Sequence, residues 1–196
     1  MEAYSKEMQE EIRNFLKKTG VNFEDTGYKW HELFNELFQP SELLRKAYED
    51  AHITKEPYIS IQFRFVNALE QFEGYTFFDN HLKTQAERDA LIEKCRNCIK
   101  DIQKDNSNAP VYVFSDSKVF LDSINDLPVL TLSHDNIGHT GVKQQQETTL
   151  KTFLDLYVMS QSEKIYRIKA KELYNLSCFA LLASRMNNAQ FIDIEI

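Results

Sequence analysis

The sequence predicts a doubly wound α/β protein, with a mainly parallel sheet of about five strands and an α-helical N-terminal cap. From Pro57 onward, short apolar runs rich in β-branched residues alternate five times with longer amphipathic runs. This alternation is typical of a parallel sheet with helices on both faces. Residues 1–55 show helical periodicity and no strand-like run. We therefore expect a helical segment over residues 1–55 and a sheet domain over residues 56–196.

Composition narrows the classes of protein that are compatible with the chain. The 196 residues suffice for one domain or for one domain and a small appendage. The net charge of −7 argues against nucleic-acid binding, which needs clustered cations. No apolar run approaches the roughly 20 residues of a membrane span, and the charged start is unlike a signal peptide. Three cysteines without a regular spacing indicate reduced thiols, so we expect a cytoplasmic protein without an integral membrane segment.

The N-terminal segment is predicted to be helical throughout. Apolar residues spaced by three and four predict a helix over residues 2–19, with Gly20 as its C-terminal stop. The stretch "YKWHELFNELF" repeats the pattern, and we expect Trp30 and its phenylalanines to pack in the core. An alternative is that this aromatic stripe mediates dimerisation or contacts a protein partner. Ser41 is the predicted N-cap of the next helix, "SELLRKAYEDA".

In the sheet domain, strands and helices are predicted in strict alternation. The predicted strands are "YISIQFRF", "PVYVFSD", "LPVLTLS", "EKIYRIK" and "QFIDIEI". The predicted helices are "TQAERDALIEKCRNCIKDIQK", "SKVFLDSI", "QQETTLKTFLDLYVMSQ" and "KELYNLSCFALLASRM", and "QKDNSNAP" and "SHDNIGHTGVKQQQ" are predicted loops. Cys95 and Cys98 lie within the first of these helices. We interpret them as helix-face residues rather than as a metal or redox pair.

Polar residues follow the predicted strands, at the edge where parallel sheets bind ligands. They comprise cations, hydroxyls and a helix start, namely Arg64, Asn67, Ser115, Asp116, Ser117, Ser133, His134, His139, Arg167, Lys169, Lys171 and the turn "YNLSCF". Such groups suit an anionic, nucleotide-like ligand. Arg64 has two interpretations, a phosphate ligand or an ordinary salt bridge. Asp116 likewise has a functional interpretation and a structural one, as N-cap of the helix that follows it.

Sequence motifs of well-known enzymes are missing from the chain. It contains no GxGxxG, GxxxxGK[ST], GxSxG or HExxH, and no DxD run follows a strand. Nicotinamide and P-loop nucleotide binding are therefore unsupported. We expect no metal site.

Three short stretches, taken together and in order, resemble the donor-binding half of the GT-B fucosyltransferase superfamily. They are "IQFRFVN", "VYVFSDS", and "DLYVMSQSEKIYRI" joined to "YNLSCFALLAS". The first resembles a strand that ends in His-x-Arg before an acidic residue, and the second a strand that ends near Ser-Asp. The resemblance covers about 140 residues from Pro57 onward and extends to bacterial sugar transferases of surface-polysaccharide genes. It implies a Rossmann-like fold and metal-independent glycosyl transfer from a GDP-sugar to a glycan acceptor.

The resemblance also implies roles for individual residues. Arg64 would hold the β-phosphate and stabilise the departing diphosphate, as a guanidinium fork suits two phosphate oxygens. Asp155 takes the place of the aspartate that recognises the guanine edge. Ser177 and Phe179, at the start of the last helix, would line the phosphate site. Asp116 lies in the second motif, whose role in the superfamily is largely structural.

The chain departs from the superfamily pattern at its first motif. Gln62 replaces the histidine, Asn67 replaces the acidic residue, and Phe65 replaces a second basic residue found in several members. Gln62 and Asn67 can still hydrogen-bond a base or ribose, but neither can act as a base. Fewer residues precede the first strand than an acceptor-side domain needs. The alternative is therefore a degenerate or truncated donor domain that binds a nucleotide without transferring a sugar.

Overall fold

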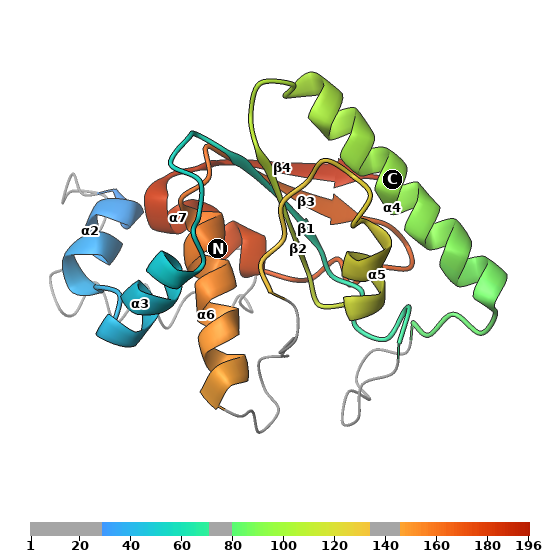
Figure 1. The fold of residues 1–196 in the computed structure, drawn as a ribbon, viewed down its shortest axis with the longest axis horizontal. Helices are drawn as coiled ribbons and strands as arrows, with labels where there is room; N and C mark the ends of the chain where they lie inside the picture. The colour runs from blue at the N-terminus through green and yellow to red at the C-terminus, as the bar shows by residue number, and fades with distance from the viewer. Residues whose placement is uncertain (1–28, 71–79, 134–145) are drawn as a thin grey trace, which may run out of the picture.

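The protein forms an α/β fold built on a four-stranded, all-parallel sheet, in the computed structural model shown in Figure 1. The structure describes residues 29–70, 80–133 and 146–196. The strands are β1 (Ile59–Phe63), β2 (Val111–Ser115), β3 (Lys164–Lys169) and β4 (Gln190–Glu195), in the order β2-β1-β3-β4. The predicted doubly wound α/β class is therefore confirmed, with four strands in place of about five.

The missing strand is the stretch "LPVLTLS", which joins the sheet through a single residue. Leu130 forms a parallel bridge with Tyr112, donating its N–H to Val111 and accepting one from Val113. Pro128 has no N–H to donate, and the N–H of Val129 turns back to the carbonyl of Leu127 at 2.8 Å. Because of these two features, only Leu130 in this stretch is oriented to form backbone hydrogen bonds with β2.

Helices α4 (Gln85–Asp105) and α5 (Lys118–Ser123) cover one face of the sheet (Figure 1). The start of α4 is fixed by a capping box, because Thr84 accepts the N–H of Glu87 and Glu87 accepts that of Thr84. Cys95 and Cys98 are buried against the sheet, as a helix-face position predicts. Burial raises the pKa of the Cys95 thiol to about 12 and that of Cys98 to about 11.

The opposite face is covered by α6 (Gln146–Ser160) and α7 (Phe179–Asn187). The predicted helix "KELYNLSCFALLASRM" is wrong in its first half, because α7 begins only at Phe179. Asn175 explains the difference: its side-chain amide donates to the carbonyl of Ala170 at 2.8 Å and accepts the Ala170 N–H at 3.3 Å. This pair of bonds folds residues 170–175 into a turn that competes with the helix.

Within residues 29–70, two short helices precede the sheet, α2 (Trp30–Leu37) and α3 (Glu42–Asp50). Ser41 caps α3 by accepting the Leu44 N–H at 3.3 Å, which confirms the predicted N-cap. Apolar residues of α3 pack on the same core cluster as α6 and α7. The predicted helix over residues 2–19 and its stop at Gly20 lie outside the described residues.

The expectation that the aromatic stripe of α2 is core is wrong. Trp30 is 49% exposed and Phe38 is 60% exposed. The rings of Trp30, Phe34 and Phe38 stack as a ladder along the surface of α2, with centroids 5.1 and 5.0 Å apart. The cause is the position of α2, which lies against α7 rather than over the sheet: the Asn35 amide donates to the Met186 carbonyl.

Candidate ligand-binding edge of the sheet

The site is the carboxyl edge of the sheet between β1 and β3. These strands are neighbours, yet the chain leaves β1 toward α4 on one face and leaves β3 toward α7 on the other. Such a point is where an open parallel sheet leaves a crevice for ligands. The two loops that leave it are joined directly, since the Tyr174 N–H donates to the Arg64 carbonyl at 2.8 Å.

Asp116 organises the loop that follows β1. Its Oδ1 accepts the Phe65 N–H at 2.7 Å, and its Oδ2 accepts the Val66 N–H at 2.9 Å. The Nε of Arg64 lies 3.3 Å from the same Oδ2. Asp116 is buried, whereas the Arg64 side chain is 22% exposed. Arg64 therefore has a structural carboxylate as its partner, which lies 3.3 Å from its Nε.

The predicted role of Asp116 as N-cap of the following helix is wrong. Ser117 caps α5, because its Oγ accepts the Phe120 N–H at 3.2 Å. The Ser117 hydroxyl in turn donates to Glu70 at 2.6 Å. Ser117 sits one residue closer to the helix, which leaves the Asp116 carboxylate to turn toward β1.

The loop held by Asp116 contains a strained residue. Val66 has φ of 55°, in the left-handed region that a β-branched residue rarely enters. The two hydrogen bonds from the N–H groups of Phe65 and Val66 to the Asp116 carboxylate hold the backbone in this conformation. Strain of this kind persists where the surroundings hold it in place, and it is concentrated at ligand sites.

Two predicted site residues cap the start of α7 from within the protein. The Gln62 carbonyl oxygen accepts the Ala180 N–H at 3.3 Å, and the Ser177 hydroxyl accepts the Phe179 N–H at 3.4 Å. Both side chains are buried. The Ser177 carbonyl also accepts a 2.7 Å bond from Arg167. Gln62, Ser177 and Phe179 thus lie together at the start of α7. Gln62 already accepts the Ala180 N–H, so this N–H group is not available to an anion.

Asn67 is buried at the far end of the strained loop. Its N–H donates to Asn80 at 3.2 Å, and its carbonyl lies 3.0 Å from Nδ1 of His81. The Asn80 amide also donates to the carbonyls of Phe65 and Glu172, both at 2.7 Å. Asn80 therefore ties the loop after β1 to the loop after β3. Sequence reasoning missed Asn80, because no pattern marks an asparagine that bridges two loops.

Asp155 stands apart from the other predicted site residues. It lies within α6 and accepts two bonds from Lys151, at 2.5 and 2.7 Å, one turn earlier on the same helix. Burial raises its pKa, and Lys151 opposes that shift. None of the described contacts links Asp155 to Arg64, Asp116 or the start of α7.

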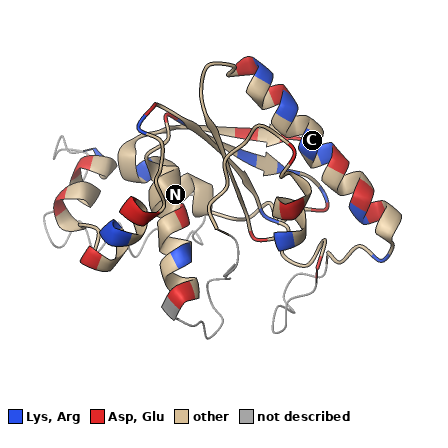
Figure 2. Cartoon of the chain, viewed as in Figure 1, with Lys and Arg blue, Asp and Glu red and all other residues tan. Residues whose placement is uncertain are grey.

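Two other cations predicted at this edge, Arg167 and Lys169, are already engaged, whereas Lys171 is 87% exposed. Arg167 binds both carboxylate oxygens of Asp193, at 2.7 and 2.8 Å, and Lys169 reaches the same carboxylate at 2.8 Å. These contacts hold the pKa of Asp193 at about 2. Figure 2 shows acidic and basic residues interspersed along α4. His134 and His139, which were also predicted at this edge, lie outside the described residues.

The fold and this edge define a Rossmann-like α/β protein with a strained, carboxylate-braced loop at its topological switch point. No protein-family model matches the chain, and no curated protein matches it. Among residues 29–70, 80–133 and 146–196, no cluster of His, Cys, Asp and Glu has the arrangement of a metal site. In the same ranges, no helix has the length and apolar character needed to cross a membrane.

Proposed function

We propose that the protein is a fucosyltransferase-like donor domain that binds the diphosphate of a GDP-sugar at the β1–β3 edge. One observation carries the proposal. Nε of Arg64 lies 3.3 Å from Oδ2 of Asp116, and neither Nη1 nor Nη2 makes a hydrogen bond to a described residue. The two Nη groups are the arms of a guanidinium that bind paired phosphate oxygens.

The surroundings of Arg64 support this role. A phosphate beside β1 would lie near the start of α7, where the remaining N–H groups favour negative charge. Asp116 would prevent Arg64 from rotating, so no ordering of the side chain is needed on binding. During transfer the bond between the sugar C1 and the diphosphate oxygen breaks. Arg64 would then stabilise the charge that grows on the leaving diphosphate.

Isothermal titration with GDP and GDP-fucose tests the proposal. We expect both to bind, and Arg64→Ala to weaken binding about tenfold or more, which corresponds to about 1.4 kcal/mol. Arg64→Lys should rescue little, because an ammonium lacks the fork. Arg45→Ala is the matched control, an exposed arginine on α3. Absence of binding by the wild type at millimolar GDP would overturn the proposal, as would an Arg64→Ala protein that binds like the wild type.

The second candidate function is nucleotide binding without transferase activity. The observation that favours it is the engagement of Gln62, whose carbonyl caps Ala180, together with the amide at Asn67. Neither amide can remove a proton from an acceptor hydroxyl. Release of GDP from GDP-fucose, measured with and without a glycan acceptor, separates the two functions. Acceptor-dependent release supports the transferase, and GDP binding without release supports the second function.

A further inference from the structure

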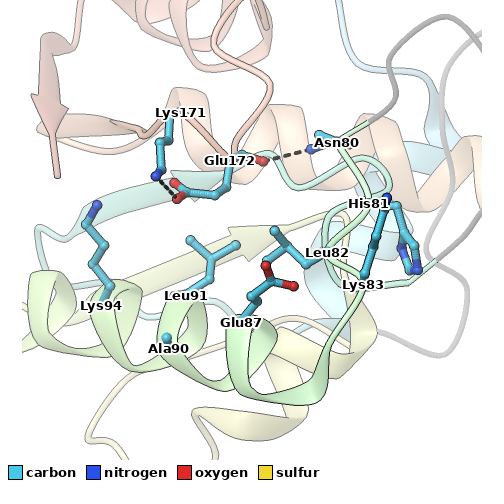
Figure 3. A pocket seen from close by; sticks show the side chains of 10 residues that line it. All are labelled: Asn80, His81, Leu82, Lys83, Glu87, Ala90, Leu91, Lys94, Lys171 and Glu172. Atoms are coloured by element: carbon cyan, nitrogen blue, oxygen red, sulfur yellow. Dashed lines mark hydrogen bonds and ion pairs between the residues drawn. The ribbon is translucent and has the colours of Figure 1, made fainter.

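A cleft of about 760 Å³ lies beside the β1–β3 edge, between the first turns of α4 and the loop after β3. Figure 3 shows Glu172 on the loop side and Leu91, Lys94 and Glu87 on the α4 side. Asn80 forms one end of the cleft and ties it to the Arg64 loop through the Phe65 carbonyl. The cleft is thus adjacent to the proposed phosphate site but is lined by different residues.

Glu172 is the unusual group in this cleft. Its backbone carbonyl is fixed by Asn80, and its Oε1 lies 3.5 Å from Nζ of the exposed Lys171. Its Oε2 is buried and accepts no hydrogen bond from any described residue. A buried carboxylate oxygen without a donor is rare in folded proteins and calls for a partner. The Glu172 side chain is 20% exposed and lines the cleft, so a small turn of its carboxylate would bring Oε2 within reach of a ligand hydroxyl or amine.

The charge around Glu172 is positive, although the whole chain carries −7. Three lysines line the cleft, Lys83, Lys94 and Lys171, against the two acids Glu87 and Glu172, so the difference is +1. Glu87 is already used, because it accepts the N–H and hydroxyl of Thr84 in the capping box. Among the described residues, no ion pair within 4.0 Å engages Lys83 or Lys94. These lysines favour an anionic group.

The floor between the charged groups is apolar. Leu82, Ala90 and Leu91 line it, and Leu91 is buried against the sheet. The cleft therefore offers one buried acceptor, several cations and a small apolar surface. An anionic sugar presents the matching groups, since it has hydroxyl donors, one acidic group and the apolar face of a pyranose ring.

We propose that the cleft lined by Glu172, Lys83 and Lys94 binds an anionic monosaccharide, with a sugar hydroxyl donating to Glu172 and the acidic group lying among the lysines. This binding does not depend on the proposed GDP-sugar site. The acidic group can be a carboxylate or a phosphate, and the two sources are tested separately.

Titrations followed by amide NMR spectra test the proposal with four probes: galacturonate, glucose 6-phosphate, neutral glucose and inorganic phosphate. We expect at least one of the two anionic sugars to give saturable shifts at the amides of Leu82, Ala90 and Lys94, with a dissociation constant of about 1–10 mM. Glucose and phosphate, which each lack half of the recognised groups, should bind at least about fivefold more weakly. Binding of galacturonate alone identifies the acidic group as a carboxylate, and binding of glucose 6-phosphate alone identifies it as a phosphate.

Variants assign the binding to the cleft. Glu172→Gln and Lys94→Ala should each weaken sugar binding about fivefold or more. Lys104→Ala, an exposed lysine at the other end of α4, is the matched control. Arg64→Ala should leave this binding unchanged, which distinguishes it from the GDP site. Far-UV circular dichroism shows whether each variant is folded; should Glu172→Gln not fold, Lys94→Ala alone decides the outcome. No saturable shift with either anionic sugar up to about 20 mM would overturn the proposal, as would equal binding of phosphate and glucose 6-phosphate.

Discussion

Replacing Asp116 by alanine should destabilise the protein by about 3 kcal/mol. The carboxylate accepts two backbone N–H bonds at 2.7 and 2.9 Å and lies 3.3 Å from Nε of Arg64. Hydrogen bonds to a buried charge contribute about 2 kcal/mol each, and the partly exposed ion pair adds about 1 kcal/mol. Release of the strained Val66 backbone returns about 2 kcal/mol, which leaves a net loss of about 3 kcal/mol.

Urea denaturation followed by far-UV circular dichroism measures this loss. Asp116→Asn should lose less than Asp116→Ala, because one amide oxygen can still accept an N–H. Asp101→Asn, at an exposed position of α4, is the matched control and should stay within about 0.5 kcal/mol of the wild type. A double-mutant cycle with Arg64→Ala should give a coupling of about 1 kcal/mol. If Asp116→Ala unfolds at the same urea concentration as Asp101→Asn, the carboxylate does not brace the loop.

Three further predictions follow from other contacts. Thr84→Ala removes the N-cap of α4 and should cost about 1 kcal/mol in urea denaturation; a loss near zero would contradict the capping box. In the folded protein a thiol reagent at pH 8 should modify the exposed Cys178 rapidly, and Cys95 and Cys98 only after unfolding, because burial raises their pKa to about 11–12. The pKa of Asp193 is lowered to about 2 from the ordinary 3.8. The ionised carboxylate therefore contributes its full stabilisation when the pH is well above 3.8, and this stabilisation is lost as the pH falls toward 2. The difference in melting temperature between wild type and Asp193→Asn should accordingly shrink between about pH 6 and pH 2, and a constant difference would refute it.

The parallel sheet was predictable because its signal is local. Ile59, Ile61 and Phe63 in β1 are apolar and are buried beneath α4. The apolar character of this short run was therefore enough to predict a buried strand. The single bridge at Leu130 could not be predicted, because the apolar run around Leu130 has the same composition as a full strand. Such a run pairs with a neighbouring strand only if its backbone N–H groups are not already hydrogen-bonded in a nearby turn. The composition of the run does not contain that information.

The positions of the candidate residues at strand ends were predictable, but their contacts were not. Arg64 and Asp116 were both expected at strand ends, yet their sequence separation of 52 residues hides that one braces the other. The exposure of Trp30 shows the same limit, since a periodic apolar stripe predicts a helix face without stating what covers it. Partners supplied by tertiary structure, such as Asn80 between two loops, leave no pattern in the sequence.

The geometry of Arg64 differs from that of the other paired arginines in this protein. Arg167 binds Asp193 through Nε and Nη2, at 2.7 and 2.8 Å, and Arg96 binds Asp126 through Nη1 and Nη2, both at 2.7 Å. Each of these pairs has two parallel hydrogen bonds, which is the strongest mode of a guanidinium toward a carboxylate. The two Asp116 oxygens instead accept two backbone N–H groups, and Oδ2 lies 3.3 Å from Nε of Arg64. A second parallel hydrogen bond would strengthen the Arg64–Asp116 pair, and its absence among the described contacts supports the proposal that Nη1 and Nη2 serve a ligand.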